Sequence, residues 1–261
     1  MRTCLLIGFE YTKDMFLPGI EQDISQILKH IQSIEPDRIT ILSDIPSKRI
    51  PDSEHTSYKK FKTTKKFLKV VSRTVESGNQ VFLYYTGHAR KGKFLLPNDD
   101  KVKMSSIRKI LQSSTSPTAE ILCLLDCCES TGLDLGFQIG SNKIPTSSQI
   151  TQKIICISSS SEGQRSICTK SGSIFTSQVI KRLSKRQLKL DSSFRELIIH
   201  KLHKTFKKKL GIKIDSTSGS LFEREFGISS LVLITLSHPN LNSVWSWCLG
   251  FPSRQKMKGK S

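Results

Sequence analysis

Short apolar runs of about six residues recur along the chain and alternate with longer stretches in which apolar residues repeat at helical spacing. The runs predict strands at Thr3–Phe9, Arg38–Leu42, Gln80–Tyr85, Glu120–Asp126, Lys153–Ser158 and Ile228–Leu236. Helical spacing occurs over Ile20–Ile31, Phe61–Val75, Phe175–Leu183 and Phe194–Phe206. Strands that alternate with helices in this way predict an α/β fold with a mostly parallel six-stranded sheet and helices on both faces.

Two polar segments interrupt this alternation and are predicted to be loops. Pro46–Tyr58 is rich in Pro, Ser and charge, and Gly132–Ser148 contains several Gly and Ser residues. Periodicity is lost after residue 237, and the final stretch is polar and basic. We therefore expect one domain over residues 1–237 and a disordered basic tail over residues 238–261.

The composition is that of a globular protein, with 261 residues, of which 36% are hydrophobic and 24% are charged. No apolar run approaches the ~18 residues that a membrane span needs, and the run at Cys4–Phe9 is too short for a signal peptide. The seven cysteines contain no CxxC spacing, which argues against a zinc site. We expect a cytoplasmic protein, with its thiols reduced, that does not contact membranes.

The formal net charge of +19 raises the question of an anionic partner. Lysines cluster at Lys59–Lys69 and at Lys201–Lys213. Such clusters attract nucleic acids and other polyanions, although they also occur on ordinary solvated surfaces. Aromatic residues scarcely interleave with these lysines, so no platform for base stacking is predicted. Nucleic acid stays a possible partner that no motif supports.

Two predicted strands end at chemically reactive side chains. The first segment reads VFLYYTGH and ends at His88, and the second reads ILCLLDCCES and contains Cys127 and Cys128. Because the carboxyl ends of neighbouring strands in an open α/β sheet border one crevice, the His and a Cys are expected to face each other there. That pair is the combination of a thiol nucleophile and its general base.

These segments resemble the metacaspases, a branch of the caspase-like cysteine peptidases. YYTGHA with FLLPNDD resembles one metacaspase motif and LLDCCES another, and the segments CLLIG with LPGIEQDI and ISSSSEGQRS resemble two more. The four motifs occur in the family's order over roughly residues 1–180. The resemblance implies a caspase-like fold, in a compact form without a pro-domain, and a cysteine endopeptidase that cleaves after Lys or Arg.

The resemblance also implies the catalytic roles. Cys128 is expected to be the nucleophile, because the family's reactive Cys lies two positions after the Asp that Asp126 matches. Cys127 occupies a small-residue position and is expected to point to the other side of the chain. His88 would accept the thiol proton and later protonate the leaving amine. The backbone N–H of Gly87 or of Cys128 is expected to form the oxyanion hole.

By the same resemblance, Asp23 and Asp126 line the pocket for the substrate side chain, together with Ile20 and Thr86. Two carboxylates at one crevice are costly unless a cation joins them, which agrees with a Lys or Arg in the substrate. Ile20 replaces a Cys of the family and makes the wall bulkier. The alternative for Asp23 is an ordinary acid at a helix N-terminus, stabilised by the helix dipole.

The sequence departs from the family pattern in three places. Glu129 replaces the usual His, and a serine run at Ser158–Ser161 replaces Gly, Cys and Asp. Lys101 and Lys103 stand where calcium-dependent members have acids. Calcium needs about six or more oxygen ligands, so we expect neither a metal nor another cofactor.

Three functions remain open, and the peptidase is favoured. The alternative is a catalytically inactive caspase-like protein that binds nucleic acid or another polyanion, for which the net charge and Glu129 argue. A thiol redox protein that uses Cys127 and Cys128 is disfavoured, because adjacent cysteines form strained disulfides. The peptidase is expected to be a monomer that cuts its own Gly132–Ser148 loop after Lys143.

Overall fold

A seven-stranded sheet forms the centre of the computed structural model, which describes residues 1–33, 35–51, 55–113, 119–128, 153–160, 166–184 and 233–236. Its strands are β1 (Arg2–Gly8), β2 (Arg38–Ser43), β3 (Thr56–Lys60), β4 (Gln80–Thr86), β8 (Glu120–Asp126), β9 (Lys153–Ser158) and β12 (Leu233–Leu236). The order across the sheet is β12-β9-β8-β4-β1-β2-β3. All neighbours pair in parallel except β12, which is antiparallel to β9.

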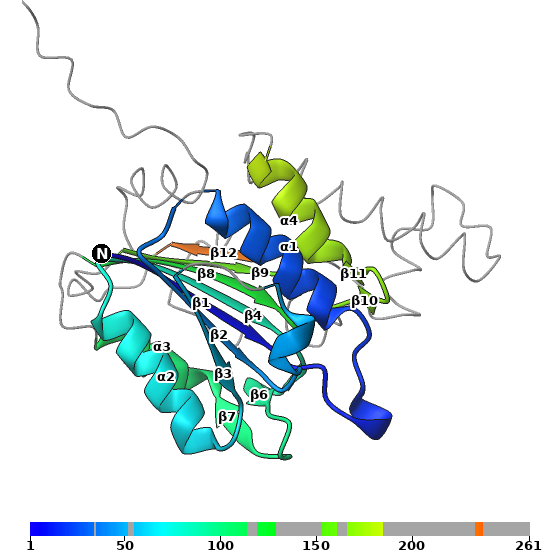
Figure 1. The fold of residues 1–261 in the computed structure, drawn as a ribbon. Helices are drawn as coiled ribbons and strands as arrows, with labels where there is room; N and C mark the ends of the chain where they lie inside the picture. Colours follow the sequence, from blue (N-terminus) through cyan, green and yellow to red (C-terminus); the bar gives the residue numbers. More distant parts are fainter. Residues whose placement is uncertain are drawn as a thin grey trace, which may run out of the picture.

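Helices cover both faces of this sheet (Figure 1). Helices α1 (Ile20–Gln32) and α4 (Ile174–Ser184) pack on one face, and α2 (Thr64–Glu76) and α3 (Met104–Gln112) pack on the other. Because successive side chains of a strand point to opposite faces, β4 contributes Tyr84 to the core under α1 and α4 and Tyr85 to the core under α2 and α3. Each face therefore has its own apolar core.

The predicted fold class is confirmed, and the sheet contains one strand more than the sequence indicated. Each of the six predicted stretches contains or overlaps a strand. The additional strand, β3, begins within the segment Pro46–Tyr58, which was predicted to be a loop, so the prediction was wrong for the end of that segment. Strand β3 reads TSYKK, has no fully buried residue and pairs only with β2 at the sheet edge. A polar edge strand lacks the apolar alternation by which strands are predicted.

Helix α3 and several short elements were not predicted from the sequence. The short elements are the 3-10 turns η1 (Lys13–Met15) and η2 (Ser47–Arg49), the small sheet of β5 (Ala89–Arg90), β6 (Lys93–Leu95) and β7 (Lys101–Lys103), and the hairpin of β10 (Cys168–Thr169) and β11 (Gly172–Ser173). Several predictions concern residues outside the described ranges. They are the helix at Phe194–Phe206, the roles of Glu129 and Lys143, and the tail 238–261. Within the described ranges, no helix combines the length and apolar character that crossing a membrane requires.

The register of the three central strands places the reactive segments side by side. Gly8 of β1 pairs with Thr86 of β4, and Thr86 pairs with Asp126 of β8. Since the three strands are parallel and end at the same level, the residues that follow Thr86 and Asp126 emerge together at one edge of the sheet. This edge is the crevice at which α/β folds bind ligands.

Candidate active site

A cavity of about 330 Å³ lies at the carboxyl ends of β4 and β8. It is lined by Leu17, Ile20, Thr86, Gly87, His88, Asp126, Cys128, Ser166, Cys168 and Ser173. Six of the seven residues expected to form the active site therefore border one space, although they come from three separate parts of the chain. The seventh, Asp23, is not among the residues that line this cavity.

The two adjacent cysteines lie on different sides of the chain, as predicted. Cys128 is half-buried and lines the cavity, as does the half-buried His88. Cys127 is 1% exposed and packs in the core under α2 and α3. Only Cys128 of this pair is thus available to a molecule in the cavity.

The imidazole of His88 is held by a backbone carbonyl. Its Nε2 lies 2.8 Å from the carbonyl oxygen of Met15, at the end of η1. Because a carbonyl only accepts hydrogen bonds, Nε2 carries the ring proton, and Nδ1 of the neutral ring is left with a lone pair. The ring is therefore in the tautomer that a general base acting through Nδ1 requires. Nothing in the sequence pointed to Met15.

One of the two backbone donors expected for the oxyanion hole, the N–H of Gly87, takes part in the pairing of β4 with β8. The Gly87 N–H donates to the carbonyl of Asp126 over 3.3 Å, which continues the ladder between β4 and β8 by one bond. The next N–H, of His88, donates to the hydroxyl of Tyr11 over 2.8 Å. Whether Gly87 or Cys128 supplies the oxyanion donor therefore stays a prediction.

The carboxylate of Asp126 forms a buried polar wall of the cavity. Oδ1 accepts from the hydroxyl of Ser166 and Oδ2 from the hydroxyl of Thr176, both over 2.6 Å. Burial raises the pKa of Asp126, and the hydroxyl donors around it oppose that change. Ile20 and Thr86 line the same cavity, as predicted.

Asp23 lies directly behind this wall and is fully buried in α1. Its Oδ1 accepts from the N–H of Ser173 over 2.7 Å, and its Oδ2 has no hydrogen-bond partner within the described part of the chain. Burial, and secondly the negative charge of Asp126, raise the pKa of Asp23 to about 8. Asp23 stands in the first turn of α1, where the helix dipole favours an acid, but that alternative does not by itself account for its complete burial beside Asp126.

The sequence did not single out Cys168, whose thiol also lines the cavity. It donates to the carbonyl of Pro18 over 2.7 Å. Burial and then the nearby acids Asp23 and Asp126 raise the pKa of this thiol. A raised pKa keeps Cys168 protonated, which makes this thiol a poor nucleophile.

The serine run beside the site supports the segment that carries Cys128. The hydroxyls of Ser159 and Ser160 both donate to the carbonyl of Cys127, over 3.2 Å and 2.8 Å. The N–H of Ser159 donates to the carbonyl of Leu125 over 2.9 Å. These serines therefore restrain the backbone next to Cys128, in place of the Gly, Cys and Asp that the resemblance implied.

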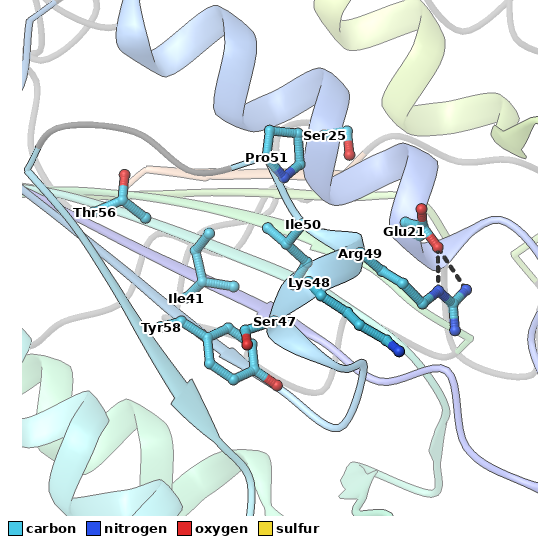
Figure 2. Close-up of a pocket in the computed structure, with 10 residues that line it drawn as sticks. All are labelled: Glu21, Ser25, Ile41, Ser47, Lys48, Arg49, Ile50, Pro51, Thr56 and Tyr58. Carbon is cyan, nitrogen blue, oxygen red and sulfur yellow. Dashed lines mark hydrogen bonds and ion pairs between the residues drawn. The ribbon is translucent and has the colours of Figure 1, made fainter.

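A larger cavity, of about 740 Å³, lies beyond α1 and lacks this chemistry (Figure 2). Lys48 and Arg49 of η2 and Glu21 of α1 border it, together with the apolar Ile41 and Ile50. The Arg49 guanidinium is engaged by Glu21 and by Glu10. Among its lining residues there is no thiol, imidazole or unengaged carboxylate pair, so the smaller cavity is the candidate active site.

The described ranges contain no group of three His, Cys, Asp or Glu side chains that could hold a metal ion. Lys101 and Lys103, which replace the acids of calcium-dependent relatives, are exposed on β7. Asp100 accepts hydrogen bonds from Thr64 and Asn98.

Comparison with known proteins agrees with this geometry. The family model described as the caspase domain matches residues 1–218. Caspase-1 from Spodoptera frugiperda is 12% identical, with a TM-score of 0.53, and the alignment covers 90% of this chain and 85% of that one. A structural-genomics protein from Geobacter sulfurreducens is also 12% identical, with a TM-score of 0.50 and coverage of 77% and 88%. At this identity the likenesses establish the fold alone, and the search of curated proteins gave no match.

Proposed function

The chain belongs to the caspase domain family, and from this membership we propose that it is a cysteine endopeptidase of metacaspase type that cleaves after Lys or Arg. One observation carries the proposal: a single cavity gathers the thiol of Cys128, the imidazole of His88 and the carboxylate of Asp126. The first two are a nucleophile and its base, and the third attracts a cation.

The chemistry follows from the tautomer of His88. Nδ1 takes the proton of the Cys128 thiol, which at neutral pH is only a few per cent ionised without help. The sulfur then forms a bond to the scissile carbonyl carbon, and the negative oxygen is met by the N–H of Cys128. The imidazolium returns the proton to the leaving amine as the C–N bond breaks, which leaves a thioester. Water, deprotonated by the same Nδ1, hydrolyses the thioester and regenerates the thiol.

The acids give the side-chain preference. Asp126 borders the cavity, and Asp23 lies next to it with Oδ2 unpaired within the described part of the chain. A Lys or Arg side chain brings the positive charge that this pair lacks. An Asp side chain would add a third carboxylate, and loss of a buried charge pairing costs roughly 2–5 kcal/mol. Discrimination for Arg over Asp should therefore exceed about a hundredfold.

Peptide hydrolysis by the purified chain tests this proposal. A fluorogenic peptide with Arg at the cleaved position should be cut, and its Asp counterpart should not. Cys128→Ala should abolish cleavage, and His88→Ala should lower it nearly as far, because residues that act as a unit are not additive. Cys127→Ser, on the other side of the strand, is the matched control and should retain most activity. Loss of activity in Cys127→Ser but not in Cys128→Ala would place the nucleophile one residue earlier, and a preference for Asp would overturn the specificity.

A second candidate, binding to nucleic acid, is favoured by the surface over β3 and α2. Seven exposed cations lie there with no acid between residues 55 and 75: Lys59, Lys60, Lys62, Lys65, Lys66, Lys69 and Arg73. None of the seven takes part in an ion pair within the described ranges. Two lysines fall in the first turn of α2, where the helix dipole disfavours cations, so helix stability does not account for them.

Salt-dependent binding of labelled duplex DNA tests the second candidate. Each phosphate contact contributes about −0.9 to the slope of log K against log salt concentration. The charge reversals Lys62→Glu, Lys65→Glu and Lys69→Glu should together reduce that slope, whereas the same change at Lys29, Lys48 and Lys170 should leave it nearly unchanged. An equal decrease of the slope in both triple variants would mean that DNA binding depends on the net charge alone, and it would refute a binding surface over β3 and α2.

A further inference from the structure

Two buried tyrosine hydroxyls hold the backbone of His88 between β4 and β5. The His88 N–H donates to Oη of Tyr11 over 2.8 Å, and Oη of Tyr85 donates to the His88 carbonyl over 2.9 Å. The Leu95 N–H donates to the same carbonyl over 3.0 Å. Both polar groups of the His88 backbone are thus bound, although His88 lies outside the main sheet.

Tyr11 contacts the backbone and the ring of His88 together. Its hydroxyl accepts from the His88 N–H and donates to the carbonyl of Leu95 over 2.8 Å. Its ring lies against the imidazole, with ring centroids 4.7 Å apart. Burial raises the pKa of Tyr11, so the hydroxyl keeps its proton and can donate and accept at once. Tyr11 is therefore built into the support of His88.

The backbone of Tyr11 adopts a conformation that ordinary residues avoid. Its φ is 59°, in the left-handed region. The carboxylate of Asp44 accepts from the N–H of Glu10 and from that of Tyr11, over 2.8 Å and 2.9 Å, and fixes this turn. Met15, whose carbonyl holds the His88 ring, belongs to the same loop. Because the Asp44 carboxylate stabilises this unfavourable backbone conformation, the orientation of the Tyr11 side chain is expected to have a function.

Gly87 makes room for both hydroxyls. A Cβ atom at Gly87 would lie 2.9 Å from Oη of Tyr11 and 3.1 Å from Oη of Tyr85. Both distances are shorter than ordinary van der Waals contact, so a side chain at this position would push the hydroxyls away from His88. The absence of a side chain at Gly87 thus permits the contacts of both tyrosine hydroxyls with His88.

We propose that Tyr11 is a positioning residue that fixes His88 in the orientation from which Nδ1 reaches the thiol of Cys128. The proposal rests on the peptidase function proposed above. Without the Tyr11 hydroxyl, the His88 N–H loses its acceptor while Met15 still pulls on Nε2, and the ring tilts. In such an arrangement a shift of about 1 Å costs on the order of a hundredfold in rate. Loss of the Tyr85 hydroxyl costs less, because the Leu95 N–H still holds the same carbonyl.

Three Tyr→Phe variants test the proposal. Tyr11→Phe keeps the ring contact, and we expect kcat on an Arg peptide to fall about 10- to 100-fold with little change in KM. Tyr85→Phe should show a smaller decrease. Tyr58→Phe is the matched control, since its hydroxyl bonds backbone carbonyls of Ser43 and Ile45 away from the candidate active site, and it should keep the wild-type kcat.

A second measurement does not depend on peptidase activity. The pH profile of Cys128 alkylation by iodoacetamide, followed by mass spectrometry, reports how well His88 supports the thiolate. We expect the midpoint to move to higher pH in Tyr11→Phe and not in Tyr58→Phe. A purely structural role would lower the melting temperature without moving this midpoint.

The outcomes separate this proposal from the function on which it rests. A wild-type chain that cuts no peptide refutes the peptidase, while the alkylation profile still tests Tyr11. An active enzyme in which Tyr11→Phe keeps the wild-type kcat and alkylation profile refutes the positioning role. If Tyr11→Phe does not fold, Gly87→Ala perturbs the same hydroxyls from the other side, and an unchanged kcat and alkylation profile there refutes the role equally.

Discussion

Replacement of Asp23 by Asn should stabilise the fold and at the same time impair the enzyme. Asp23 is fully buried, and burial together with the charge of Asp126 raises its pKa from 3.8 to about 8. A tenfold change in proton affinity is worth about 1.4 kcal/mol. The ionised carboxylate therefore destabilises the native state by roughly 6 kcal/mol once the pH is above 8. Asn keeps an oxygen acceptor for the Ser173 N–H and carries no charge.

The sign of the pH dependence follows from which state holds the proton. Below about pH 4 Asp23 is protonated in the folded and the unfolded chain, and it has no effect on stability. Between about pH 4 and pH 8 the folded protein keeps a proton that the unfolded chain releases, so stability falls as pH rises. Above pH 8 both states are ionised and the full penalty remains. Asp23→Asn removes this loss, so its advantage should grow from pH 5 to pH 9.

Thermal unfolding followed by circular dichroism measures the effect. For a domain of this size one kcal/mol corresponds to roughly 2–4 °C, so Asp23→Asn should melt about 10 °C higher than the wild type at about pH 9. The gain at about pH 5 should be clearly smaller. Asp99→Asn makes the same chemical change at an exposed position and should leave the melting temperature nearly unchanged at both pH values. In parallel, Asp23→Asn should lower kcat/KM for an Arg peptide. A gain that does not depend on pH, or a loss of stability at pH 9, would refute the reasoning.

Two further predictions concern features outside the pair of acids. Activity should be unaffected by a calcium chelator, because Lys101 and Lys103 are exposed where the related acids would be; saturable stimulation by calcium would contradict this. The purified enzyme should cut itself after Lys143 and the fragments should stay associated, because β8 and β9, on either side of the cut, pair in the sheet. Mass spectrometry of the wild type beside Cys128→Ala decides this, since an intact wild-type chain, or a nick that persists without Cys128, would exclude it.

The residues found from the sequence share one property, namely a fixed short offset from a buried apolar run. Thr86 is the last residue of β4 and His88 follows two positions later, and Asp126 and Cys128 occupy the equivalent places at the end of β8. The parallel register then brings both pairs to one edge of the sheet. A local pattern was sufficient here because the fold turns equal offsets on neighbouring strands into proximity.

The residues that escaped prediction act over distances that no local pattern reports. Tyr11 meets His88 from 77 positions away, and Ser166 and Thr176 meet Asp126 from 40 and 50 positions away. The hydrogen bond of the Gly87 N–H has the same origin, since it depends on the pairing of β4 with β8. Chain order and hydrophobic pattern indicate which strands meet. They do not indicate which hydroxyl fills a given hydrogen-bonding position.

Successive side chains at the strand ends point to opposite faces of the sheet. In the proposed function, residues on one face would bind the substrate side chain and residues on the other would position His88. On the face of α1 and α4 lies the buried Asp23, which in the proposed function would help to bind the positive charge of the substrate side chain. On the face of α2 and α3, Tyr11 and Tyr85 pack in the other core and hold His88, which affects how the bound peptide reacts. Substitutions on the two faces should therefore separate kinetically. Changes at Asp23 should alter the ratio of kcat/KM between Arg and Lys peptides and their neutral analogues, whereas changes at Tyr11 should lower kcat by the same factor for every peptide that is cut.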